Sequence, residues 1–98
     1  MHATIRRIRT QPGQAEAVAA LIESEYVPLI AGTAGFVSYT LVDLGEDEVS
    51  SVGVFADPGS AEQANATAKS WTAERLAPYV ASPLEAHAGR VLVDHRTS

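Results

Sequence analysis

The sequence contains no cysteine, which excludes disulfides, thiolate metal sites and cysteine nucleophiles together. Only seven residues are basic against 12 that are acidic, and the formal net charge is −5. The chain therefore lacks the basic surface that binding to nucleic acid or to an anionic membrane requires. No segment approaches the roughly 18 consecutive apolar residues of a membrane-spanning helix, and MHATIRRIRT has no apolar signal core. We expect a cytoplasmic protein that binds neither nucleic acid nor a membrane.

The chain is short, and its length limits how it can be organised. Its 98 residues are 46% hydrophobic and 19% charged, as in globular proteins, so we expect residues 1–98 to form one domain. A chain of this size buries only about 60–70% of the surface that its unfolded form exposes. An interface with a second subunit would therefore add to its stability.

Alternating and β-branched residues predict four strands. Residues 2–10 form the first and end at the turn QPG, and residues 36–56 form a hairpin around the polar turn LGEDE. The segment GRVLVDHRT, residues 89–97, is predicted to close the chain as the last strand, with Pro83 in the loop before it. Along the first strand, Arg6 should point to one side of the sheet and Arg7 and Arg9 to the other.

Two segments with helical spacing separate these strands. The first follows Gly13, and Pro28 should kink or end it because proline lacks a backbone donor. The second starts either at Pro58 or at the capping box that Ser60 forms with Gln63. Its apolar stripe changes phase after Trp71, which predicts a break near Thr72.

The resulting order, βαββαβ, predicts a ferredoxin-like sandwich, in which two helices cover one face of a four-stranded antiparallel sheet. Right-handed connections place the first and third strands in the centre. The hairpin carries apolar residues on both of its faces, so the uncovered face needs a second layer. A homodimer with sheet packed on sheet would supply it.

Several segments resemble one family. They are the PG turn after the first strand, the segment GFVSY, the strand end VFADPGSAEQA and the approach APYVASPLEAHAGRVLV to the last strand. In these the chain is similar to the antibiotic biosynthesis monooxygenases, which are dimeric α+β barrels. The resemblance implies a homodimer with a small-molecule pocket between sheet and helices. It also implies activities that range from cofactor-free oxidation of phenols or anthrones to haem degradation, and includes members with no known activity.

The chain departs from the haem-degrading relatives at three places. They carry an asparagine on the first strand, a tryptophan at the end of the third strand and a histidine on the second helix. Here the first place falls near Arg7 and the second on Phe55, and no histidine lies in residues 59–80. Haem degradation is therefore not expected. The quinone-forming relatives use that tryptophan too, and Trp71 and Asn65 are candidates to replace it in space.

Five residues are candidates for binding a substrate, each with a structural alternative. Arg7 could stabilise a phenolate or form an ion pair at an interface, and Tyr39 could donate to a carbonyl or fill the sandwich. Trp71 could stack on a ligand or belong to the core. Phe55 occupies the position of the family tryptophan, and His87 is either a general base at the mouth of a pocket or a solvated loop residue.

The resemblance implies that no cofactor is required. No metal site is expected either, because His2, His95 and Asp94 alone do not make one. Three hypotheses remain. The first is a cofactor-free monooxygenase acting on a small phenolic or polycyclic aromatic metabolite. The others are a non-catalytic small-molecule-binding dimer and a structural dimer whose pocket is filled by its own side chains.

Overall fold

Four antiparallel strands form one sheet in the computed structural model, which describes residues 1–97. They are β1 (His2–Thr10), β2 (Phe36–Gly45), β3 (Glu48–Phe55) and β4 (Val80–Arg90). Their order across the sheet is β2-β3-β1-β4, so the predicted ferredoxin-like arrangement, with the first and third strands central, is confirmed. The end of the predicted domain at residue 98 lies outside the described residues.

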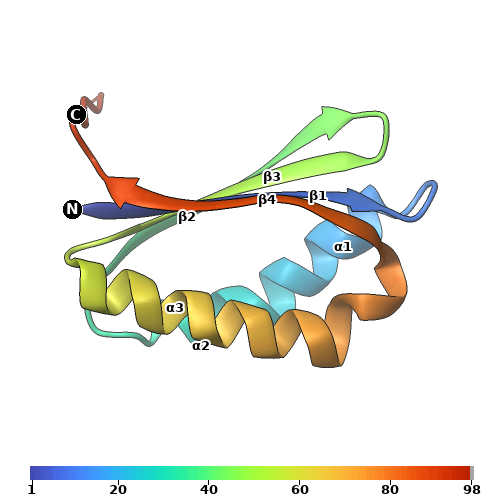
Figure 1. The fold of residues 1–98 in the computed structure, drawn as a ribbon, viewed down its shortest axis with the longest axis horizontal. Helices are drawn as coiled ribbons and strands as arrows, with labels where there is room; N and C mark the ends of the chain where they lie inside the picture. Colours follow the sequence, from blue (N-terminus) through green and yellow to red (C-terminus); the bar gives the residue numbers. More distant parts are fainter. Residues whose placement is uncertain (98) are drawn as a thin grey trace.

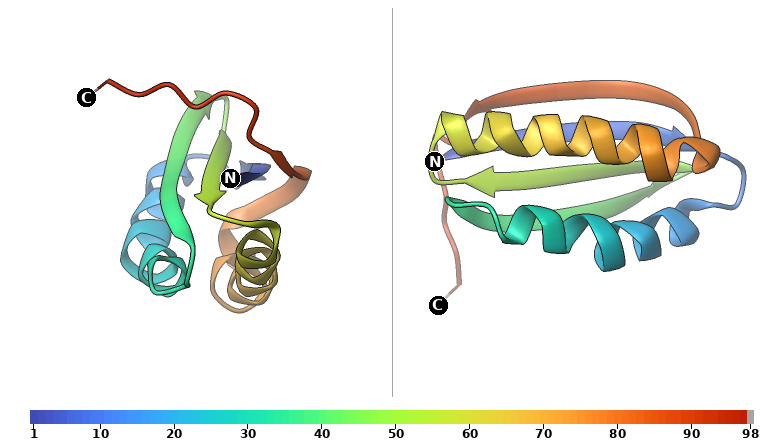
Figure 2. Two further views of the ribbon diagram at one scale, coloured as in Figure 1. Left: turned by 90° about the vertical axis from the view of Figure 1, so that its left-hand side faces the viewer. Right: turned by 90° about the horizontal axis from the view of Figure 1, so that it is seen from below.

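Two helical segments lie side by side on one face of the sheet (Figures 1 and 2). The first consists of α1 (Ala15–Leu21), a π-helical turn (Ile22–Tyr26) and α2 (Val27–Ala31). The second consists of α3 (Pro58–Trp71), a π-helical turn (Thr72–Leu76) and a short 3-10 turn (Ala77–Tyr79). None of the described helices has the length and apolar character needed to cross a bilayer.

Each helical segment contains a π-helical turn that ends two residues before a proline, at Tyr26 before Pro28 and at Leu76 before Pro78. In an α-helix the proline ring would clash with the carbonyl four residues earlier, and a wider turn relieves this clash. The helix does not end at Pro28, one of the two predicted alternatives, because helical structure continues to Ala31. At Thr72, where the sequence predicts a break, the helix changes from α to π, and helical structure continues without interruption to Tyr79.

The last strand lies earlier than the sequence predicts. β4 covers Val80–Arg90, whereas residues 91–97 have no regular secondary structure. Pro83 and His87 are therefore strand residues rather than loop residues. β4 is an edge strand, where a proline is tolerated, and its register against β1 shifts beside Pro83.

Two starts were possible for the second helical segment, Pro58 and the capping box at Ser60. The structure has the first, because α3 begins at Pro58. Asp57 is the N-cap, and its carboxylate accepts a hydrogen bond from the backbone N–H of Ser60 at 2.8 Å. That hydrogen bond lowers the pKa of Asp57. The Ser60 hydroxyl donates to the same carboxylate at 3.2 Å, which holds it against Gly35 in the loop before β2.

Gly35→Ala is expected to destabilise the fold by about 1–3 kcal/mol. Gly35 has a φ of +86°, and an added Cβ would lie 2.5 Å from the Ser60 hydroxyl oxygen. Urea unfolding measures the loss. Gly13→Ala is the matched control, because its φ is +75° with no atom within 4 Å. Equal losses in the two variants would show that backbone strain alone, and not the contact with Ser60, explains the effect.

The two faces of the sheet differ in burial. The core lies between the sheet and the helices, and its largest fully buried side chains include Phe55, Ile30 and Val18. The opposite face, which we call the open face, is not covered by any helix or strand of residues 1–97 (Figure 1). Ile5 on this face is 43% exposed.

Candidate functional site

A partly enclosed cavity of about 160 Å³ lies between the sheet and the two helical segments. All four strands and both π-helical turns contribute to its wall, which is mostly apolar. The residues that line it are Thr4, Arg6, Ile8, Ile22, Tyr26, Tyr39, Leu41, Val49, Ser51, Ala68, Trp71, Thr72, Leu76, Pro83, Glu85 and Ala86. We refer to it as the aromatic cavity.

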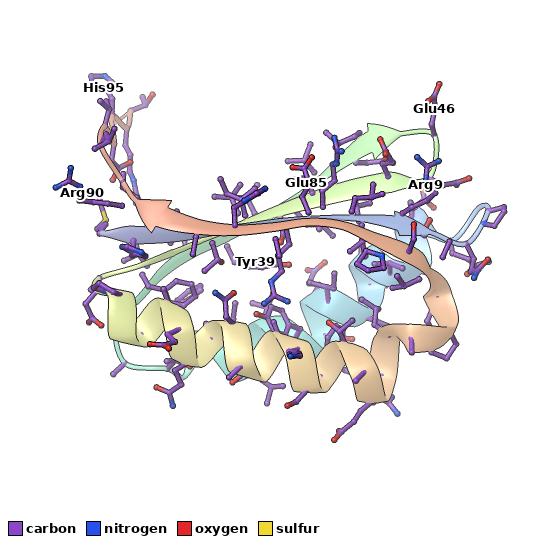
Figure 3. All side chains as sticks on the ribbon, viewed as in Figure 1. Arg9, Tyr39, Glu46, Glu85, Arg90 and His95 are labelled. Atoms are coloured by element: carbon purple, nitrogen blue, oxygen red, sulfur yellow. The ribbon has the colours of Figure 1, made fainter. Side chains whose placement is uncertain are left out.

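Three aromatic side chains pack together at the aromatic cavity. The ring of Tyr26 lies 5.6 Å from that of Tyr39, edge to face, and 5.3 Å from that of Trp71. Tyr39 points from the sheet toward the helices (Figure 3). Both tyrosine rings are largely removed from water, so each hydroxyl can act as a hydrogen-bond donor inside an apolar site.

Arg6 provides the positive charge at this cavity. Its guanidinium donates to the side-chain oxygen of Asn65 on α3 at 2.9 Å and to the backbone oxygen of the same residue at 3.2 Å. Within residues 1–97 it makes no ion pair with a carboxylate. A half-buried guanidinium that binds only a neutral amide keeps donors and a charge available for an anionic ligand.

The predicted site residues divide between two faces of the sheet. Tyr39 and Trp71 line the aromatic cavity. Arg7 lies on the open face, where its guanidinium is 2.9 Å from Glu85, and His87 is 3.8 Å from the same carboxylate. Figure 3 shows Glu85 and Arg9 pointing away from the helices. Phe55 is 1% exposed in the core and is not among the residues that line the cavity.

Sequence reasoning missed Arg6 and Tyr26 as site residues. Tyr26 lies four residues after Ile22 and eight after Val18, so helical spacing already placed it on the buried face. Strand alternation placed Arg6 opposite Arg7. It did not say which of the two arginines would face the helices, because Ile5 and Ile8 put one isoleucine on each side.

Burial raises the pKa of Tyr26 to about 12 and also raises the pKa of Tyr39. The neutral phenol of Tyr26 is favoured in the folded state, so its contribution to stability is complete below its ordinary pKa of about 10. That contribution is lost as the pH rises from about 10 to about 12.

We expect the urea midpoint of the wild type to fall over this pH range and that of Tyr26→Phe to fall less. The phenylalanine keeps the ring but cannot ionise, so it isolates the titration. Denaturation curves at increasing pH, with tyrosinate followed by its ultraviolet absorbance, provide the measurement. Curves that fall in parallel for the two proteins would assign the alkaline loss to other groups.

The types of side chain in the described residues limit the reactions that the aromatic cavity could support. Among residues 1–97 no group of three or more histidine, aspartate or glutamate side chains could hold a metal ion. The residues that line the aromatic cavity include no histidine. The donors present are a guanidinium, two tyrosine hydroxyls and the hydroxyls of Ser51, Thr4 and Thr72, which suit an oxygen-bearing organic ligand.

Comparison with known proteins identifies the family to which this chain belongs. The family model for antibiotic biosynthesis monooxygenases matches residues 1–74. The chain belongs to this family. A search of the curated proteins found no match.

Solved structures of similar fold include members of the monooxygenase family. A protein of unknown function from Nitrosomonas europaea is 21% identical, with a TM-score of 0.80 over 99% of this chain and 94% of that one. A protein from Chloroflexus aurantiacus that is named a putative antibiotic biosynthesis monooxygenase is 20% identical, with a TM-score of 0.75 over 97% and 96%. SnoaB, a cofactor-independent oxygenase from Streptomyces nogalater, is 18% identical, with a TM-score of 0.71 over 95% and 94%. At these identities the structures show a shared fold.

Proposed function

We propose that this antibiotic biosynthesis monooxygenase family member is a cofactor-free oxygenase that converts a small phenol to a quinone in the aromatic cavity. The observation that carries the proposal is Arg6, a guanidinium that makes no ion pair within residues 1–97 and lines a mostly apolar cavity together with Tyr26 and Tyr39. A phenolate reduces O₂ far more readily than a phenol does. Residues that favour the phenolate therefore supply the chemistry that a cofactor would otherwise supply.

Arg6 would donate charge-assisted hydrogen bonds to the phenolate oxygen and lower the pKa of the bound phenol. Tyr26 and Tyr39 stay neutral at physiological pH and would donate to the same oxygen or to the oxygen that enters. Overall, one atom of O₂ becomes the second quinone oxygen, and the other leaves as water with the ring hydrogen and the phenol proton. Ile8, Val49 and Leu76 would keep bulk water from the ring.

The size of the cavity favours a single aromatic ring. A cavity of about 150 Å³ with apolar walls holds a benzene ring in other proteins, and this one measures about 160 Å³. A larger polycyclic compound would have to extend beyond it. The test is oxygen uptake by the purified protein with single-ring phenols, with the quinone identified by mass spectrometry and its second oxygen atom traced to isotopically labelled O₂. No uptake with any compound would reject the oxygenase.

A non-catalytic binding protein is the second candidate. It is favoured by the absence of histidine among the residues that line the aromatic cavity and by Phe55 at the family tryptophan position. It predicts that phenols raise the melting temperature without any product. Product formation would exclude it, and absence of any melting shift would leave only a structural role.

The open face supports a homodimer as part of the same proposal. Ile5 and Val42 are 43% and 44% exposed on it, and the Nε of Arg7 is buried without a hydrogen-bond partner in residues 1–97. The C-terminal segment leaves the sheet on this side (Figure 1), and its Leu92 and Val93 are 79% and 84% exposed. A second copy packed on this face would cover these apolar groups.

Light scattering is expected to give twice the chain mass of 10.3 kDa, and Ile5→Asp is expected to give the monomer. A carboxylate at the centre of a dry interface is left without water or a partner, which costs several kcal/mol. Leu29→Asp is the control, because Leu29 is exposed on α2, in the helical layer. A wild type of 10.3 kDa would reject the dimer.

A further inference from the structure

A second hollow lies beside the aromatic cavity, between α3 and the edge strand β4. It measures about 330 Å³ and is lined by Arg6, Asn65, Ala66, Lys69, Ala86, His87 and Ala88. It shares Arg6 and Ala86 with the aromatic cavity, so the two spaces are adjacent. We call it the α3–β4 hollow.

Positive charge is concentrated in the α3–β4 hollow. Within residues 1–97, the arginine and lysine side chains that form no ion pair are those of Arg6, Lys69 and Arg90, and the first two line this hollow. No carboxylate lines it, although the whole chain carries 12 acidic residues and seven basic ones. The His87 side chain is 68% exposed and lies near Glu85, so it is not counted among these cations.

Position on the helix explains why Lys69 is unpaired. The residues three and four positions away on α3 and the following turn are Asn65, Ala66, Thr72 and Ala73, none of them acidic. The rest of the hollow is walled by the small side chains of Ala66, Ala86 and Ala88. The hollow therefore offers space, a half-buried guanidinium and the exposed ammonium of Lys69, and no acidic residue is among the residues that line it.

We propose that the α3–β4 hollow is the mouth of the aromatic cavity and binds a carboxylate carried by the substrate, so that the substrate class is an aromatic hydroxy acid. This deepens the proposed function and rests on it. The ring would enter the aromatic cavity, and Arg6 would lie between the phenolate oxygen and the carboxylate. Lys69 would contact the carboxylate alone, because it lines only the hollow.

The test compares three probes that share one ring: dihydroxybenzoate, its methyl ester and hydroquinone. Isothermal titration with the full chain is expected to give tighter binding for the acid than for either neutral probe, with an affinity that falls as salt is raised. Lys69→Ala should weaken binding of the acid about three- to fivefold and leave the ester unchanged. Lys69→Arg should restore it, and Arg90→Ala, which removes the unpaired cation outside the hollow, should have no effect.

Each result decides one point. Equal affinities for acid and ester, equal weakening of both by Lys69→Ala, or no binding of any probe would overturn the inference. Salt-dependent binding of the acid without oxygen uptake would keep the ligand class and reject the oxygenase. Conversion of hydroquinone to a hydroxyquinone, in which one oxygen atom comes from O₂, with no preference for the acid would keep the oxygenase and reject the ligand class. Inorganic phosphate, run as a fourth probe, should compete with the acid more strongly than with hydroquinone, which carries no group for the hollow, and equal competition with both would count against the inference.

Discussion

A Phe55→Ala variant is expected to lose about 3–5 kcal/mol of unfolding free energy, the largest change in stability that we expect from a single substitution here. Phe55 is 1% exposed at the end of β3 and packs edge to face on Phe36, with the ring centres 6.0 Å apart. Its removal deletes the ring's burial and leaves a cavity in a small core. Since domains of this size have only about 5–15 kcal/mol of stability, a large part would be lost.

Urea unfolding at constant protein concentration measures this effect. Phe55→Leu is the matched control, because it keeps an apolar side chain and is expected to cost less than about 1.5 kcal/mol if the core repacks. Both variants should retain affinity for phenols whenever they are folded, since Phe55 does not line the aromatic cavity. A Phe55→Ala protein of nearly normal stability that no longer binds phenols would instead make Phe55 a binding residue.

The sequence predicts the fold well where the local preference of a segment and its pairing in the sheet favour the same structure. The hairpin turn is an example, because Glu46 and Asp47 adopt φ values of 53° and 63°, as a tight turn between two strands needs. β4 was misplaced because its segment VASPLEAHAGR has little β-branched character, whereas the following VLV has much. The length of the partner strand sets the end of β4. β1 begins at His2, which pairs with Arg90, so beyond this pair only Met1 is left, and its backbone oxygen accepts a hydrogen bond from the N–H of Val91.

The site was harder to predict, because it depends on which face of β1 meets the helices. Alternation separates Arg6 from Arg7, yet one isoleucine stands on each side, so hydrophobicity does not identify the buried face. The structure shows that Thr4 and Thr10, both buried, share the face of Arg6. Two polar residues mark that buried face, which is the reverse of the usual pattern for a half-buried strand.

Arg6→Gln is expected to lower kcat/KM for oxygen uptake with a phenol about 10²–10³-fold, as the loss of one preorganised donor to a developing oxyanion does elsewhere. Glutamine can still bind Asn65 but carries no charge, so the pKa of the bound phenol would no longer be lowered. Arg7→Gln is the matched control. It changes the neighbouring residue of the same strand on the open face, away from the aromatic cavity, and should leave the rate close to that of the wild type.

The pH profile separates this role from a structural one. In the wild type the rate should rise with pH through a phenol pKa that Arg6 has lowered, and then level off. In Arg6→Gln the same rise should occur at higher pH, so that alkaline conditions restore part of the rate, and Arg6→Lys should lie between the two. A variant that loses activity equally at every pH, together with melting temperature, would show that Arg6 acts by holding β1 to α3 through Asn65. A variant with unchanged rates would remove Arg6 from the mechanism and leave the two tyrosine hydroxyls as the oxyanion donors.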